Sequence, residues 1–172
     1  IKRLPADTYN VQHRGGRGIT GMTTREDDTV ENMFVCSSHD YIMLFSNLGR
    51  MYRIKAYEIP EGSRTSKGMN IVNILPLMAD EKITIILPAS ELDEEKFITM
   101  VTKKGIIKRT KLSEFKHTRK TGIIAISIDD DDELTFVKMT DGNDNLFIAT
   151  KKGMAIQFNE NQVRAMGRGA RG

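Results

Sequence analysis

Short apolar runs recur along the chain, each bounded by glycine or by polar residues. Three of these runs are followed by a turn that ends in glycine and then by a second run, within residues 41–53, 97–109 and 146–157. Paired β-branched and apolar runs around a glycine turn are typical of β-hairpins. No long stretch has apolar residues at the helical spacing of 3.6, so the pattern predicts an all-β fold.

The hairpins are part of an internal repeat. Their turn glycines are Gly49, Gly105 and Gly153, and a second glycine series follows at positions 18, 68, 122 and 172. A further strand is predicted after the second glycine, at residues 19–22, 71–75 and 123–128. The fourth strand follows an acidic turn, at residues 30–36, 83–87 and 134–139. Four strands in about fifty residues are typical of a propeller blade.

The repeat divides the chain into four parts of one predicted domain. These are an incomplete first blade at 1–39, blades at 40–95 and 96–144, and an incomplete blade at 145–172. The chain therefore holds roughly three four-stranded units and begins inside one of them. Because propellers close with about four to eight blades, we expect it to be a fragment of a longer domain.

The segment from Gln12 to Gly18, which reads Gln-His-Arg-Gly-Gly-Arg-Gly, is the strongest candidate for chemistry. Glycine allows positive φ angles and a close approach of the backbone to a phosphate. Arginine forks its guanidinium onto phosphate oxygens. The segment therefore favours nucleic-acid binding, with a solvated turn as the alternative. A disordered RNA-binding tail would need many more such repeats.

Composition narrows the class of protein. Apolar residues make up 39% and charged residues 28%, which is typical of a globular protein. A single cysteine, Cys36, excludes an internal disulfide. No apolar run approaches the ~20 residues that span a bilayer, so we expect a cytoplasmic protein. The net charge of +3 alone says little about a nucleic-acid partner.

The distribution of charge along the repeat says more than its sum. Basic residues gather in the hairpins and in the loop before each second glycine, whereas acidic residues gather between the units. In a radial array we therefore expect separate basic and acidic bands, and a basic band suits a phosphate backbone. The alternative is an ordinary solvated surface. The candidate DNA-binding residues are Gln12, Arg14, Gly15, Gly16, Arg17, Gly18, Arg50, Arg53, Arg64, Lys67, Lys103, Lys104, Lys108, Arg109, Arg119, Lys120, Arg164, Arg168 and Arg171.

Catalytic and metal-binding patterns are weak. The three histidines lie in different units without ligand spacing, and Cys36 has no evident histidine partner. There is no phosphate-binding P-loop. The acidic run 129–132 lacks the spaced ligands and central glycine of a calcium loop. We therefore expect a binding module with no catalytic residue, metal or cofactor of its own.

The whole chain resembles the C-terminal domain of gyrase A, one of the two DNA gyrase polypeptides. The box of that family reads Gln-Arg-Arg-Gly-Gly-Lys-Gly, and residues 12–18 keep five of its seven positions. Arg17 preserves the charge of the family lysine, whereas His13 replaces a permanent cation by a side chain that is mostly neutral at pH 7. The resemblance continues through residues 68–77, 111–115 and 163–167.

The resemblance implies a six-bladed β-pinwheel, in which neighbouring blades exchange strands. It also implies that DNA wraps positively around a basic rim, that the box is required for wrapping, and that the wrap supports negative supercoiling. ATP, Mg²⁺ and the catalytic tyrosine would act elsewhere in the parent enzyme, a bacterial type II topoisomerase. The implied partners are double-stranded DNA, the rest of gyrase A and gyrase B. The alternatives are the corresponding C-terminal domain of topoisomerase IV and a protein-interaction propeller.

Half a pinwheel would also leave strand edges open. Open edges are a common cause of self-association, so we expect a chain of this length to form dimers or to exchange strands.

Overall fold

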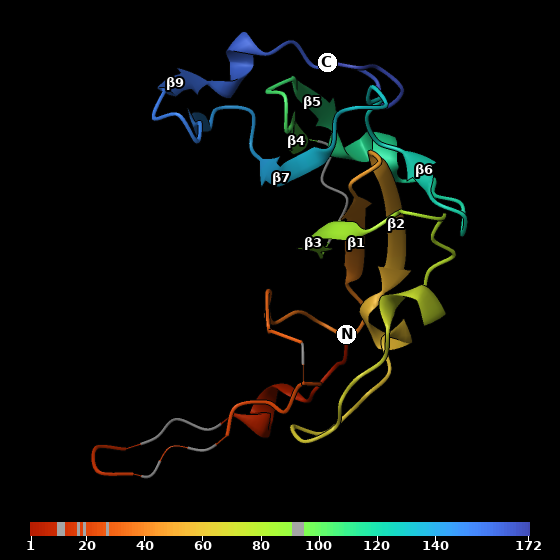
Figure 1. Cartoon of the computed structure of the whole chain (residues 1–172), viewed down its shortest axis with the longest axis vertical. Coiled ribbons are helices and arrows are strands. Elements are labelled where there is room, and N and C mark those ends of the chain that lie inside the picture. The colour runs from red at the N-terminus through yellow and green to blue at the C-terminus, as the bar shows by residue number, and fades with distance from the viewer. Residues whose placement is uncertain (10–12, 17, 19, 27, 91–94) are drawn as a thin grey trace.

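A computed structural model describes residues 1–9, 13–16, 18, 20–26, 28–90 and 95–172, which form three antiparallel β-sheets (Figure 1). No α-helix occurs within these ranges, and no helix there is long and apolar enough to cross a membrane. The strands are β1 (Tyr41–Ser46), β2 (Arg50–Lys55), β3 (Ile83–Ala89), β4 (Phe97–Thr102), β5 (Ile107–Lys111), β6 (Ile123–Ile124), β7 (Leu134–Thr140), β8 (Asn145–Ala149) and β9 (Ala155–Asn159). Five short 3-10 helices join them: η1 (Ala6–Thr8), η2 (Ala56–Glu58), η3 (Ile71–Asn73), η4 (Leu112–Phe115) and η5 (Glu160–Gln162).

The three predicted hairpins are confirmed. Strand β1 pairs with β2, β4 with β5 and β8 with β9. The turn glycines all have positive φ, at 73° for Gly49, 88° for Gly105 and 80° for Gly153. Glycine takes this conformation without steric cost, which is why the glycine spacing predicted the turns correctly.

Two of these hairpins gain a third strand, which confirms the strands predicted after the acidic turns at residues 83–87 and 134–139. Strand β3 pairs with β1, and β7 pairs with β4, in both cases antiparallel. Each pairing contains one register shift, between Phe45 and Ser46 in β1 and between Val101 and Thr102 in β4. The two units therefore share the same register shift at the same place in the repeat.

Neighbouring units exchange strands. Strand β6 follows β5 in the chain, yet it joins the first sheet beside β2, with Met51 opposite Ile123. A similar contact occurs one unit earlier without a strand, where the backbones of Ile1 and Met69 bond each other at 2.7 and 2.8 Å. The first sheet, β3-β1-β2-β6, thus reaches four strands by taking one from the next unit.

The core lies on both faces of the first sheet. Met43 and Phe45 of β1 face a cluster that includes Met100 and Phe115 of the second unit. Ile42 and Leu44 point to the opposite face. Because β1 is covered on both sides, its sequence is a continuous apolar run instead of an alternating one.

Three predicted strands are absent from the described residues. Residues 71–73 form η3, because the Asn70 side chain caps this turn by accepting from Val72 N. Residues 30–36 form no strand, and Met33 and Val35 are 72% and 82% exposed. Residues 20–22 also form none, while Ile19 lies outside the described ranges. A strand pattern is realised only where another strand completes its hydrogen bonds.

Self-association remains a prediction, and the β8–β9 hairpin is where we expect it. Phe147, Met154 and Ile156 on this hairpin are 69%, 72% and 58% exposed, and within the described residues β8 and β9 pair only with each other. Light scattering should give masses above the 19.4 kDa of one chain that increase with concentration. Replacing Phe147 and Ile156 by lysine should return the mass to that of a monomer. A monodisperse monomer of the unmodified chain at all concentrations would contradict the prediction.

Candidate nucleic-acid interface

The glycine- and arginine-rich segment forms an exposed turn. Gly15 has φ +85°, and Gly16 N donates to His13 O at 2.9 Å, so the turn requires a glycine here. Arg14 is exposed. The described residues 13–16 of the segment lie at the lower end of the molecule, far from β6 and the C-terminal loop (Figure 1). Gln12 and Arg17 lie outside the described residues, and phosphate binding by this segment remains a prediction.

Basic and acidic residues do not form the separate bands that the sequence suggested. Lys103 lies 3.8 Å from Glu133, and Lys104 contacts the carboxylate of Asp131. The carboxylate of Asp131 raises the pKa of Lys104, and Lys104 in turn lowers the pKa of Asp131. The cause is the register of the sheet, because the acidic turn enters β7 directly beside the β4–β5 turn.

The prediction that Lys108 lies on an exposed basic rim is wrong, because Lys108 lies in the interior. Its side chain is completely buried, and its ammonium donates to the carbonyl oxygens of Ala125 at 2.8 Å, Ala170 at 3.0 Å and Arg168. Burial lowers the pKa of Lys108 to about 8, with Glu114 opposing this shift and Arg168 adding to it. At pH 7 the ammonium is thus still charged and bonds the protein's own backbone.

Arg109 is also buried, and it pairs with Glu160. Its guanidinium lies 3.3 Å from the Glu160 carboxylate and 4.5 Å from the centre of the Phe97 ring. Glu160 also accepts from Thr140 Oγ1 at 2.7 Å, and from the backbone of the turn between β7 and β8. The carboxylates of Asp141, Asp144 and Glu160 lie within 4.8 Å of one another. Because hydrogen-bond donors already occupy Glu160, this cluster is a folded turn and carries no metal assignment.

Arg53 binds the loop of the following unit. Its guanidinium donates to Phe115 O at 3.2 Å and to Lys116 O at 2.8 Å, and it stacks 4.3 Å from the centre of the Tyr41 ring. The Arg53 side chain therefore holds the loop after β5 against the first sheet.

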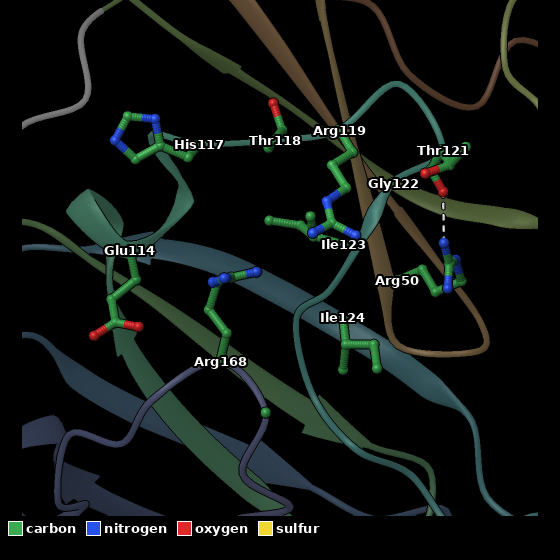
Figure 2. A pocket seen from close by; sticks show the side chains of 11 residues that line it. Arg50, Glu114, His117, Thr118, Arg119, Thr121, Gly122, Ile123, Ile124 and Arg168 are labelled. Carbon is green, nitrogen blue, oxygen red and sulfur yellow. Dashed lines mark hydrogen bonds between the residues drawn. The ribbon is translucent and has the colours of Figure 1, made fainter.

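Three arginines predicted from separate parts of the repeat meet in one groove (Figure 2). Arg50 comes from β2, Arg119 from the loop before β6, and Arg168 from the C-terminal loop. The groove has a volume of about 820 Å³ and is open to solvent. It forms where the loops of two successive units lie side by side, because β6 leaves its own unit to join β2.

The groove is positively charged. The guanidinium groups of Arg119 and Arg168 point toward its centre from opposite sides, whereas Arg50 donates to Thr121 O at its edge (Figure 2). Within the described ranges neither Arg119 nor Arg168 has a side-chain hydrogen bond or an ion pair. Glu114 is the carboxylate that lines the groove. The arrangement can bind an anionic ligand by two free guanidiniums.

The other candidate cations lie around these loops. Arg64 is half-buried and donates to Thr20 O at 3.2 Å. Arg171 pairs with Asp129. Lys67, Lys120 and Arg164 are exposed, as is Arg171. The structure does not bring them into the groove.

Several contributing residues were not predicted from the sequence pattern. His117, Thr118 and Thr121 line the groove, and no motif marks them. Lys2 holds the loop of the next unit by donating to Arg64 O at 3.0 Å and Ser66 O at 2.6 Å. A signal for Lys2 was present, because Lys2-Arg3 and Lys108-Arg109 occupy the same place in the repeat.

Comparison with known proteins places these features in a family. The family model described as DNA gyrase C-terminal domain, beta-propeller, matches residues 1–37, 40–90, 96–141 and 144–172. The gyrase A protein of Clostridium acetobutylicum is 55% identical over 172 residues, which are 100% of this chain and 21% of that protein. The chain thus spans about a fifth of the length of this curated relative.

Solved structures agree with this assignment. A DNA gyrase A C-terminal domain aligns with a TM-score of 0.73 and 30% identity, over 99% of this chain and 55% of that chain. The C-terminal domain of a DNA topoisomerase IV aligns with a TM-score of 0.72 and 31% identity, over 78% of this chain and 42% of that chain.

Proposed function

Because the chain belongs to the family of DNA gyrase C-terminal domains, we propose that it binds duplex DNA independently of base sequence and wraps it in a positive sense around its basic loops. In a complete gyrase, this wrap presents a second DNA segment for passage and supports ATP-dependent negative supercoiling. The catalytic and ATP-dependent steps belong to the rest of gyrase A and to gyrase B. The protein then acts on the bacterial chromosome, in the cytoplasm.

The pair of free guanidiniums in the groove is the observation that carries this proposal. Arg119 and Arg168 come from the loops of successive units and face a common space (Figure 2). A guanidinium binds phosphate oxygens as a planar fork, and a phosphate contact carries no information about base sequence. The same loop recurs in every unit, so such contacts can continue along a curved path of DNA.

Wrapping needs many such contacts. Bending a short DNA site smoothly through 40–90° costs on the order of 1–6 kcal/mol, which distributed phosphate contacts offset. Basic side chains outside the groove contribute further contacts to the proposed path. They are Arg14, Arg17, Arg64, Lys67, Lys120 and Arg164. Lys108 and Arg109 are omitted because they are buried.

A topological assay tests the wrap directly. The protein is bound to nicked circular DNA, the nick is ligated, the protein is removed and the linking number is scored. We expect a positive shift that increases with protein concentration and falls steeply between low and moderate salt, because each phosphate contact releases counterions. Tight binding with no shift would contradict wrapping. Binding of a partner protein in place of DNA would identify the domain as a protein-interaction propeller.

The same assay tests the role of the glycine- and arginine-rich box at residues 12–18. Replacing Arg14 and Arg17 by alanine should reduce the linking-number shift more than the affinity, if this turn fixes the path of the DNA. An equal loss of shift and affinity would show that the two arginines are ordinary phosphate contacts.

A further inference from the structure

The buried ammonium of Lys108 holds the loop that carries Arg168. All three of its N–H groups have acceptors, namely the carbonyl oxygens of Ala125, Arg168 and Ala170. Two of these carbonyls belong to residues 168 and 170, on either side of Gly169. An ammonium that binds both carbonyls fixes the backbone at the base of the Arg168 side chain.

The same arrangement recurs at Lys2. Its ammonium donates to the carbonyl oxygens of Ser63 at 3.0 Å, Arg64 at 3.0 Å and Ser66 at 2.6 Å. Arg64 and Ser66 lie four and two residues before Gly68, just as Arg168 and Ala170 lie before Gly172. The residues that follow the two lysines also match. The backbone of Arg3 forms an isolated parallel β-bridge with Glu61, and the backbone of Arg109 forms one with Ala165.

The unit between them uses different side chains for the same task. Tyr52 takes the place of the lysine in the repeat, and its ring lies against Gly122. The loop is held there by Arg50, which donates to Thr121 O, and by Arg53, which donates to Phe115 O and Lys116 O. In every case a side chain of one unit binds backbone carbonyls of the next unit.

Apart from Lys108, the loop is held by a few hydrogen bonds and one ion pair: Ser127 N donates to Ala170 O at 3.1 Å, and Arg171 pairs with Asp129. Residues 167–171 read Gly-Arg-Gly-Ala-Arg, and none of them is fully buried. Two glycines and no large apolar side chain leave the loop with high conformational freedom. Its shape therefore depends on hydrogen bonds, such as Ser127 Oγ to Gly169 O at 2.8 Å, in addition to those of Lys108.

We propose that Lys108 is a positioning residue of the DNA interface, which directs the Arg168 guanidinium into the groove by holding the carbonyls of its loop and does not itself contact DNA. Lys2 does the same for the loop of Arg64. This inference rests on the proposed function, since it assigns Arg168 to DNA. It accounts for a buried cation in a chain whose other lysines lie mostly at the surface.

Limited proteolysis tests, without DNA, whether Lys108 holds the loop that carries Arg168. In the Lys108→Met variant of the full chain, tryptic cleavage after Arg168 should rise about tenfold relative to cleavage after Arg164, because the freed loop opens locally. Lys120→Met removes the same charge from an exposed site in the neighbouring loop and should leave this ratio unchanged. An unchanged ratio in folded Lys108→Met would overturn the proposal. If that variant does not fold, Lys2→Met gives the equivalent test, with cleavage after Arg64 compared with cleavage after the exposed Lys82, which lies outside this loop.

A double-mutant cycle on duplex affinity tests the link to DNA. Lys108→Met and Arg168→Ala should each weaken binding by about three- to tenfold, and the double variant should bind no more weakly than Arg168→Ala alone. Lys120→Met should instead add its full effect to that of Arg168→Ala. Additive losses for Lys108→Met would mean a direct phosphate contact, and no loss in the folded variant would mean a purely structural lysine; either result overturns the proposal. Failure of the unmodified chain to bind DNA would contradict the proposed function. The proteolysis result would still show whether Lys108 holds the Arg168 loop.

Discussion

Replacing Arg119 and Arg168 together by alanine is expected to lower the affinity for duplex DNA about 10- to 100-fold at low salt, since each lost phosphate contact is worth about 1 kcal/mol or somewhat more. Both guanidiniums face the groove without a partner among the described residues, so their removal breaks no contact that holds the fold (Figure 2). The slope of log affinity against log salt should also fall by about 1.8, because about 0.9 counterions are released per phosphate contact with duplex DNA.

The matched control is the double variant Lys103→Ala and Lys104→Ala. It removes the same two charges from a place where they already pair with Glu133 and Asp131. Its affinity should fall less than twofold, and its salt slope should stay unchanged, because paired cations release few counterions on binding. Filter binding or fluorescence anisotropy over a salt series measures both quantities. Equal losses in the two variants would show that net charge alone, and not the groove, governs binding.

The difference between these two pairs of cations could not have been predicted from the sequence. Both pairs occupy positions in the same repeat and carry the same charge. The ion pairs of Lys103 and Lys104 arise because β7 enters beside the β4–β5 turn, and the groove arises because β6 crosses into the first sheet. Each depends on strand pairing between segments far apart in the chain, which a local pattern does not specify.

The hairpins, in contrast, were predictable because each is specified locally. A glycine turn with positive φ joins two apolar runs, and both strands of the hairpin are contained in one short segment. The strand predicted at residues 30–36 has an equally good pattern, yet no described segment pairs with it. Alternation of side chains indicates which residues can form a strand, whereas a hydrogen-bonding neighbour decides whether the strand forms.

Buried charge was the least predictable feature of the candidate site. Lys108 was expected at the rim because basic residues gather in the hairpins of the repeat, and a lysine is rarely buried unless it is paired. The structure covers its face of β5 with the loop at 164–170 from the next unit, whose carbonyls accept the ammonium. Repetition of the Lys-Arg pair at positions 2 and 108 was the available signal, because surface charges need not keep their register in a repeat.

Replacing Gly49 by alanine is expected to lower the free energy of unfolding by about 2–5 kcal/mol, which is the largest stability effect that we predict for a single methyl group. Part of this cost, about 1–2 kcal/mol, comes from the φ of +73°, which is unfavourable for L-amino acids and which achiral glycine adopts freely. The rest, about 1–3 kcal/mol, comes from steric overlap, because an added Cβ would lie 2.4 Å from Ile126 O.

The position of Gly49 explains why the methyl group has no room. Its carbonyl oxygen accepts from Ala125 N at 2.8 Å and Ile126 N at 3.2 Å, so the segment that follows β6 lies directly on the β1–β2 turn. Asn47 O, in the same turn, accepts from Leu134 N at the start of β7. The segment that follows the exchanged strand thus packs on the turn of the preceding unit, and a Cβ at Gly49 would push this segment away.

Gly105→Ala and Gly153→Ala supply the control, because these glycines occupy the same turn in the other two hairpins with φ of +88° and +80°. No described atom lies within 4 Å of a Cβ built at either position, so each should cost only the backbone term of about 1–2 kcal/mol. Urea unfolding of the three variants measures the difference. An excess cost at Gly49 measures the steric overlap with the segment that follows β6, since the backbone term is common to all three. Equal costs at the three positions would contradict the expected overlap and would mean that the segment after β6 yields to a methyl group without loss.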